Sequence, residues 1–221
     1  MLEFRMKKEW WLSIRLIHWS VVLSVFTLLI TGFYIAYPLS NGAGATADKF
    51  CMGNIRTLHT FFGVFLTFLM LWRAYLGLFA KFHASWTDLL AWTSLENLIT
   101  QVKFYLLISD EKPEHEYLYG PLQSLAYTGL IFLQFMIILT GLVMVGANYH
   151  AGLSAWVGEL LKPVEIAMVG LAGVRLIHHI IAWGFILFII VHVYMAIWID
   201  IVYKEGTISS MISGRVFRRE N

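Results

Sequence analysis

The chain has 221 residues, of which 59% are hydrophobic and only 14% are charged, and its mean hydropathy is +0.70. An ordinary soluble domain carries about 25% charged residues, so a free-standing water-soluble globule is excluded. The net charge of +2 and the dispersed Lys and Arg residues argue against a nucleic-acid-binding protein. The single cysteine, Cys51, excludes an intramolecular disulfide, a covalent CxxCH haem attachment and a four-thiolate iron–sulfur site.

Four apolar segments are each long enough to cross the ~30 Å hydrocarbon core of a bilayer as a helix. They run over residues 16–37, 58–80, 122–146 and 176–199. Only a helix satisfies its own backbone hydrogen bonds in lipid, so we expect an all-α membrane protein in which four spans form a single domain over residues 1–221. The first segment lacks a cleavage site of small residues and is expected to remain as a span.

The charges of the connections predict the orientation. Twelve of the 16 Lys and Arg residues lie in the N-terminal segment, near the inner end of the second span (Arg73), in the connection that follows this span, and in the C-terminal tail. Cytoplasmic segments carry the excess of positive charge, so both termini are expected in the cytoplasm.

Two connections are long enough to have structure of their own. Residues 85–108 are too polar to cross a membrane, but their apolar side chains recur at helical spacing. This pattern predicts an amphipathic helix lying on the cytoplasmic membrane surface or, alternatively, a small helix packed on the bundle. Residues 147–174 contain Lys162-Pro163 and are expected to form two short helices over the outer ends of the spans, or a surface that docks a partner.

Five of the eight histidines lie within the spans or at their edges: His18, His59, His178, His179 and His192. An ionisable residue in a span indicates function, although a histidine bonded to a neighbouring helix is the alternative. Positions 178 and 192 are fourteen residues apart. They therefore return to within about 40° of one helix face and lie ~21 Å apart along the axis. The fourth span thus offers two ligands at two depths.

Each of these two positions has a counterpart at its own depth. His18 lies near the cytoplasmic start of the first span and is expected to face His192. His59 lies near the outer start of the second span and is expected to face His178. Two facing imidazoles are the ligand set of a six-coordinate haem iron, and two such sites stacked across the bilayer would carry electrons. His179 is about 140° from His192 around the helix and is excluded as a ligand.

Arginines form a second pattern, because Arg15, Arg56 and Arg175 each precede a histidine by three residues. This offset places a guanidinium one turn outward from the imidazole, where it could neutralise a haem propionate. Arg73 follows His59 by fourteen residues and is expected at the depth of the inner haem. The alternative for each arginine is ordinary snorkelling at the end of a span.

Several glycines are placed to let a flat macrocycle approach the helix backbone. Gly63 lies one turn past the histidine of the second span, where it is expected to line the haem. Gly32 and Gly141 each follow a threonine. Glycines also serve ordinary helix packing in lipid.

The first and fourth spans carry long motifs that resemble a known family. Arg15 to Gly32 reads RLIHWSVVLSVFTLLITG, with Ser20 where an aliphatic residue is usual, and Arg175 to His192 reads RLIHHIIAWGFILFIIVH. Both resemble the signatures of the b-type cytochrome subunit of membrane-bound nickel–iron hydrogenases, within a wider cytochrome b family that includes the formate dehydrogenase gamma subunit. The IRTLHTFFG and WRAY segments of the second span are similar as well.

This resemblance implies a location in the bacterial inner membrane and a function. In such proteins the subunit anchors the small and large subunits of a periplasmic nickel–iron hydrogenase, receives electrons from their iron–sulfur clusters, and passes them through two haem b groups to quinone. The hydrogen chemistry belongs to the partner. Related cytochromes place a quinone pocket at the cytoplasmic entrance to the third span, where His115, Tyr119 and Gln123 could bind a quinone carbonyl. An ordinary turn with interfacial tyrosines is the alternative there.

Other functions remain open at this point. The gamma subunit of a formate dehydrogenase or thiosulfate reductase would share both haem pairs. A proton or metal-ion transporter would use the histidines as a relay or zinc site, although the spans hold few acidic residues to act as partners. A structural anchor without a cofactor is a further alternative.

Overall fold

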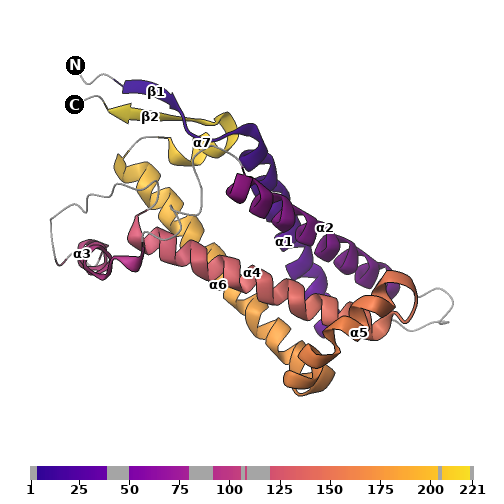
Figure 1. The fold of residues 1–221 in the computed structure, drawn as a ribbon. Helices are drawn as coiled ribbons and strands as arrows, with labels where there is room; N and C mark the ends of the chain where they lie inside the picture. Colours follow the sequence, from indigo (N-terminus) through magenta and orange to yellow (C-terminus); the bar gives the residue numbers. More distant parts are fainter. Residues whose placement is uncertain are drawn as a thin grey trace. The chain divides into compact units, whose positions relative to one another are not determined.

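The protein was analysed as a computed structural model that describes residues 4–38, 50–79, 92–105, 108, 120–203 and 206–219. Within these residues four helices are long and apolar enough to cross a membrane (Figure 1). They are α1 (Leu12–Ala36), α2 (Cys51–Phe79), α4 (Pro121–Asn148) and α6 (Gly170–Tyr203). The four predicted spans and the all-α class are therefore confirmed, and the chain is a multi-pass membrane protein.

The helices begin earlier than the apolar segments predict. Helix α2 starts at Cys51 rather than at residue 58, and α6 starts at Gly170 rather than at residue 176. Hydropathy marks only the part of a helix that lies in lipid, whereas the hydrogen-bonded backbone continues through the interface. At 1.5 Å per residue the 34 residues of α6 extend over ~51 Å, well beyond the hydrocarbon core.

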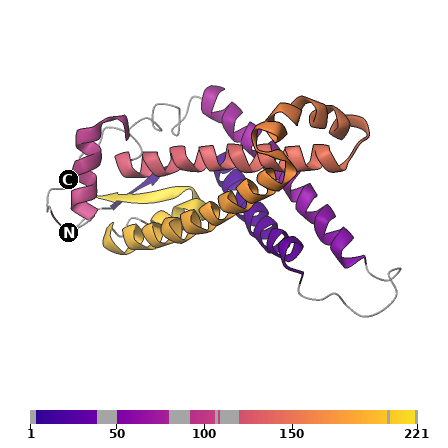
Figure 2. The same cartoon turned by 90° about the horizontal axis from the view of Figure 1, so that it is seen from below.

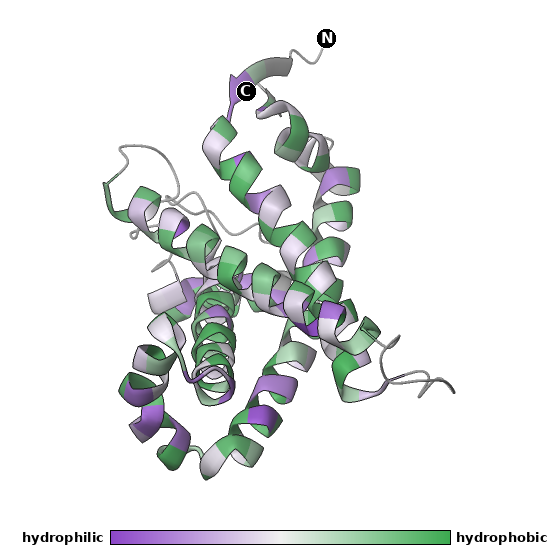
Figure 3. Cartoon of the chain, turned by 90° about the vertical axis from the view of Figure 1, so that its right-hand side faces the viewer, coloured by the Kyte–Doolittle hydropathy of each residue, from purple (hydrophilic) through white to green (hydrophobic). Residues whose placement is uncertain are grey.

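The pattern of buried and exposed side chains in the spans is the one expected for helices that lie in lipid. Large apolar side chains such as Ile30 (69% exposed) and Phe61 (62% exposed) point outward, whereas small polar side chains such as Ser24 and Thr140 are fully buried. Figure 3 shows hydrophobic residues all round the long helices. Lipid is as apolar as leucine, so small and hydroxyl-bearing residues hold the helices together.

The chain divides into two compact units, Met1–Arg73 with Ile138–Asn221, and Ala74–Ile137. The first unit contains the histidine pairs described below. The second contains α3 (Leu95–Tyr105) and the first part of α4.

The structure describes only part of the interfacial helix predicted over residues 85–108, as α3, and residues 80–91 lie outside the described residues. Gln101 of α3 is buried, and its Oε1 accepts a hydrogen bond from the Leu122 backbone N–H at 2.6 Å. This bond satisfies a free N–H in the first turn of α4. Figures 1 and 2 show α3 beside this turn. The contact favours a packed helix, although Leu95 and Ile99 leave an apolar face exposed.

The connection expected as two helices is one, α5 (Gly152–Ala167), with Pro163 inside it. The expected break at Lys162-Pro163 is therefore wrong. A proline removes one backbone hydrogen bond, here the bond to the carbonyl of the exposed Glu159. Helix α5 packs on α4 very closely, since a Cβ built at Gly146 would lie 2.5 Å from the Gly158 Cα.

The two chain ends form an antiparallel sheet that the sequence analysis did not predict. Strand β1 (Phe4–Lys8) pairs with β2 (Arg215–Arg219), which follows the short helix α7 (Thr207–Ser213). Figure 1 shows the two termini together. The alternation of apolar and basic residues in FRMKK was the available signal for a strand. The N- and C-termini thus lie at the same end of the first unit.

Candidate functional site

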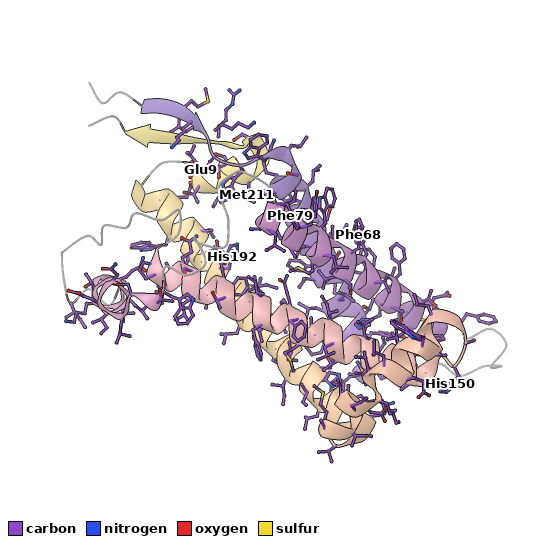
Figure 4. All side chains as sticks on the ribbon, in the orientation of Figure 1. Glu9, Phe68, Phe79, His150, His192 and Met211 are labelled. Atoms are coloured by element: carbon purple, nitrogen blue, oxygen red, sulfur yellow. The ribbon has the colours of Figure 1, made fainter. Side chains whose placement is uncertain are left out.

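The structure brings together the first predicted histidine pair. His18 of α1 and His192 of α6 have ring centroids 6.4 Å apart and ring planes inclined by 51°. His192 is labelled in Figure 4. Phe188 stacks on His192 at 5.5 Å, and Trp19 packs edge-on against His18 at 5.4 Å. Aromatic rings therefore surround this pair.

The second predicted pair joins α2 to the other end of α6. The ring centroids of His59 and His178 are also 6.4 Å apart, with ring planes inclined by 62°. Both side chains are half-buried, whereas the adjacent His179 is exposed. Helix α6 thus contributes one histidine to each pair.

The separation of the rings fits a metal ion between them. Two imidazoles directly hydrogen-bonded through their nitrogens would have centroids about 5 Å apart. Two imidazoles bound to one iron from opposite sides, with nitrogen–metal bonds of ~2 Å, would have centroids about 6 Å apart. No hydrogen bond joins the rings of His18 and His192, or those of His59 and His178, and 6.4 Å matches the metal-bridged arrangement.

A threonine hydroxyl lies within hydrogen-bond distance of the Nδ1 of each ring of the second pair. The Thr31 Oγ1 lies 2.8 Å from the His59 Nδ1, and it donates its own proton to the Thr27 carbonyl at 2.6 Å. Its oxygen must therefore accept the Nδ1–H of His59, which leaves the Nε2 lone pair free for a metal. Thr140 Oγ1 lies at the same distance, 2.8 Å, from the His178 Nδ1.

The role of these threonines is not apparent from the sequence. The two Thr-Gly dipeptides predict only that their glycines make room for a macrocycle. In the structure a Cβ built at Gly32 would lie 3.2 Å from the Cε1 of His59, and one at Gly141 would lie 3.8 Å from the Cε1 of His178. Each dipeptide therefore packs on an imidazole. A Cβ at Gly63, in contrast, would meet no atom within 4 Å, so space for a flat group lies beside that residue.

The His18–His192 pair has no such support. Neither ring has a hydrogen-bond partner within the residues that the structure describes. The pairs are therefore equal in ring separation but differ in the polarity of their surroundings.

Arg15, expected at a haem propionate, contacts the end of the chain. Its Nη1 donates to the Ile212 backbone carbonyl, and its guanidinium packs on Gly214. Its Nε is buried without a hydrogen-bond partner. The described residues therefore leave one N–H of this guanidinium unpaired.

The other three arginines differ in exposure. Arg56 and Arg175 are exposed, and within the described residues neither has a hydrogen bond or an ion pair. Arg73 is half-buried and interacts with other residues of the chain. The two arginines near the His59–His178 pair, Arg56 and Arg175, are thus free of partners among the described residues and could bind an anion.

The residues predicted to bind quinone are placed only in part. His115 and Tyr119 lie outside the described residues. Gln123 is exposed near the start of α4, and its Nε2 donates to the Tyr127 hydroxyl at 3.0 Å. Tyr127 is a neighbour that the sequence analysis did not single out.

Comparison with known proteins places the chain in a family. The model of the prokaryotic cytochrome b561 family matches residues 9–214. The chain is 31% identical over 211 residues to a probable Ni/Fe-hydrogenase B-type cytochrome subunit of Bradyrhizobium diazoefficiens, with 93% of this chain and 84% of the relative covered. It is 32% identical to the protein of the same name from Azotobacter vinelandii, with 93% and 86% covered. The chain therefore belongs to the prokaryotic cytochrome b561 family.

Proposed function

We propose that this protein is the membrane subunit of a hydrogen:quinone oxidoreductase, a b-type cytochrome that holds two haem b groups between opposed imidazoles. The observation that carries the proposal is the repeated 6.4 Å separation of the ring centroids in His18–His192 and in His59–His178. The relatives named as Ni/Fe-hydrogenase subunits support a nickel–iron hydrogenase, with its small and large subunits, as the partner.

The residues around the pairs fit two haem groups. The two histidines of α6 are fourteen residues apart, so the two sites are separated by ~21 Å along one rigid helix. Arg56 and Arg175, each one turn from a ligand of the His59–His178 pair, offer free guanidinium groups to propionates. When bound, the haem groups supply one-electron oxidation and reduction at two depths, and so connect the hydrogenase to a quinone.

The charge of the terminal sheet supports the proposed orientation. Six of its ten strand residues are Lys or Arg, and positive charge favours the cytoplasmic side. The His18–His192 pair lies at the same end of α1 as this sheet and would therefore be the inner site. His59 and His178 would form the outer site, on the periplasmic side near the hydrogenase.

The haem assignment is tested on the chain purified in detergent together with the subunits that accompany it. The dithionite-reduced minus oxidised spectrum is expected to show b-type haem, at about two haem groups per chain by extraction. His179→Ala is the matched control, because this histidine is adjacent to a ligand and exposed, and it is expected to keep both groups.

A colourless protein, or loss of haem in the His179→Ala control, would contradict the haem assignment and favour a transporter or a structural anchor. The identity of the partner is tested separately by the proteins that copurify. A formate-oxidising enzyme in place of a hydrogenase would overturn the assignment of the partner but not that of the haem.

A further inference from the structure

The two histidine pairs differ in one respect that the proposed function does not use. Thr31 and Thr140 each place a hydroxyl oxygen 2.8 Å from the Nδ1 of a ring in the His59–His178 pair. We propose that these two threonines are positioning residues, which fix the orientation of both rings and lower the reduction potential of this site relative to the His18–His192 site. This inference rests on the proposed function.

Thr31 makes a hydrogen bond beyond the backbone bond that a threonine in a helix commonly makes. Threonines in a span commonly return their hydroxyl proton to the carbonyl one turn earlier, and Thr67 does so to Gly63 at 2.9 Å. Thr31 makes this bond too, to Thr27, and it has a lone pair left for the His59 Nδ1–H. The backbone bond thus orients the hydroxyl as an acceptor for the imidazole.

Burial strengthens both contacts. Thr31 is 3% exposed and Thr140 is fully buried, so water does not compete for the imidazole N–H and the local dielectric constant is low. Gly32 lies against the Cε1 of His59. The edge of the ring that carries Nδ1 and Cε1 is therefore packed against the Thr31–Gly32 segment of α1, where glycine has no side chain to displace it.

The same arrangement occurs twice, on different helices. The Thr-Gly dipeptide of α1 contacts the histidine of α2, and the Thr-Gly dipeptide of α4 contacts His178 of α6. Both ligands of one site are thus supported, whereas neither ligand of the other site has a hydrogen-bond partner in the described residues.

This difference has an electronic consequence. An acceptor at Nδ1–H makes the opposite nitrogen a more basic ligand, and a more basic ligand favours the oxidised iron, which lowers the reduction potential. The Thr31 bond acts on the His59–His178 site in this way, Thr140 lies at the same distance from the other ligand of that site, and no described residue makes such a bond to the His18–His192 site. The threonines therefore favour electron flow from the outer site, near the hydrogenase, to the inner site.

The test removes the acceptor while keeping the shape of the side chain. Thr31→Val and Thr140→Val replace a hydroxyl by a methyl group, Thr31→Ser keeps the hydroxyl, and Thr67→Val is the control for loss of a hydroxyl that bonds only backbone. The purified complexes are titrated potentiometrically, and the low-spin iron signals are recorded by electron paramagnetic resonance. The same substitutions are also made in a His192→Ala background, in which the His59–His178 site is the one that remains, so that each signal can be assigned to its site.

Each valine variant is expected to keep two haem groups, to raise one midpoint potential and to alter one low-spin signal, both belonging to the His59–His178 site. Thr31→Ser and Thr67→Val are expected to match the parent. If Thr31→Val loses haem from this site while Thr31→Ser keeps it, the positioning role is supported as well.

The inference is overturned if both midpoint potentials stay unchanged in the double valine variant, if the His18–His192 site shifts instead, or if Thr31→Ser fails in the same way as Thr31→Val. These outcomes differ from failure of the proposed function, because in that case the parent protein itself would contain no haem.

Discussion

The two ends of α6 present the same ligand geometry in different surroundings. His178 faces His59 and His192 faces His18, with ring centroids 6.4 Å apart in both pairs. Buried hydroxyls bond the His59–His178 pair, whereas aromatic rings lie against the His18–His192 pair. The equal separation shows that the helix framework sets the distance between ligands, and the neighbours of each ring are then free to differ in ways that change its electronic properties.

The two sites also depend on different parts of the chain. Near His18, the Trp19 Nε1 donates to the Met211 carbonyl at 2.9 Å, and the Trp10 Nε1 donates to the Ser210 hydroxyl at 3.2 Å. The C-terminal segment is thus bonded to the start of α1 on both sides of Arg15. The His59–His178 pair, in contrast, is supported within the spans.

Loss of a ligand is expected to have the largest effect and to separate the sites. His178→Ala and His192→Ala should each reduce the haem content from about two groups per chain to about one, because each removes one axial ligand of one iron. Haem extraction and the reduced spectrum measure this. Loss of both groups from either variant would mean that the sites do not assemble independently.

A substitution at the end of α7 is expected to affect the site near His18 selectively. Gly214 has a φ of +80°, and a Cβ there would lie 2.8 Å from the Trp10 carbonyl oxygen and 3.2 Å from the Arg15 Cζ. Gly214→Ala should cost about 2–3 kcal/mol of stability, because it adds a steric clash to backbone strain. The measurement is the temperature at which the haem spectrum of each site is lost, and the site near His18 is expected to lose its spectrum at the lower temperature.

Gly152→Ala is the control for this substitution. Gly152 also has a positive φ, of +60°, but a Cβ there would meet no atom within 4 Å. Gly152→Ala therefore introduces backbone strain without a steric clash and should lower stability by about 1 kcal/mol. Equal effects of the two substitutions would show that contacts of the chain ends do not stabilise the first unit.

Alanine substitutions of Gly32 and Gly141 test how closely the helix backbone packs on each ring of the His59–His178 site. Gly32→Ala should displace the His59 ring, since its Cβ would lie 3.2 Å from the ring, and should cost about 1 kcal/mol. Gly141→Ala should be tolerated, because its Cβ would lie at an ordinary contact distance of 3.8 Å from His178. The low-spin iron signal of each variant tests this, and a larger change in Gly141→Ala would contradict the geometry.

The smallest effect is expected in the turn between α5 and α6. Val169, between α5 and α6, is 86% exposed with a φ of +63°, which is unfavourable for a β-branched residue. Val169→Gly should raise stability by about 0.5–1 kcal/mol through relief of this strain. A higher melting temperature with unchanged spectra is the expected result, and a change in either haem signal would show that this turn is coupled to the sites.

The sequence by itself determined the spans and the candidate ligands. A helix that crosses lipid must be long and apolar, and fourteen residues of helix return to nearly the same face, so both properties can be read along the chain. Matching depths then predicted the partners of His178 and His192, and the structure places those rings together.

Only the tertiary structure decided what surrounds the rings. The bonds from Thr31 and Thr140, the contact of Arg15 with Ile212 and the pairing of the chain ends all join segments distant in sequence. Helical periodicity gives the face and the depth of a residue on its own helix, but not the rotation of the neighbouring helix that meets it. That rotation is fixed by the packing of small residues and hydroxyls between helices.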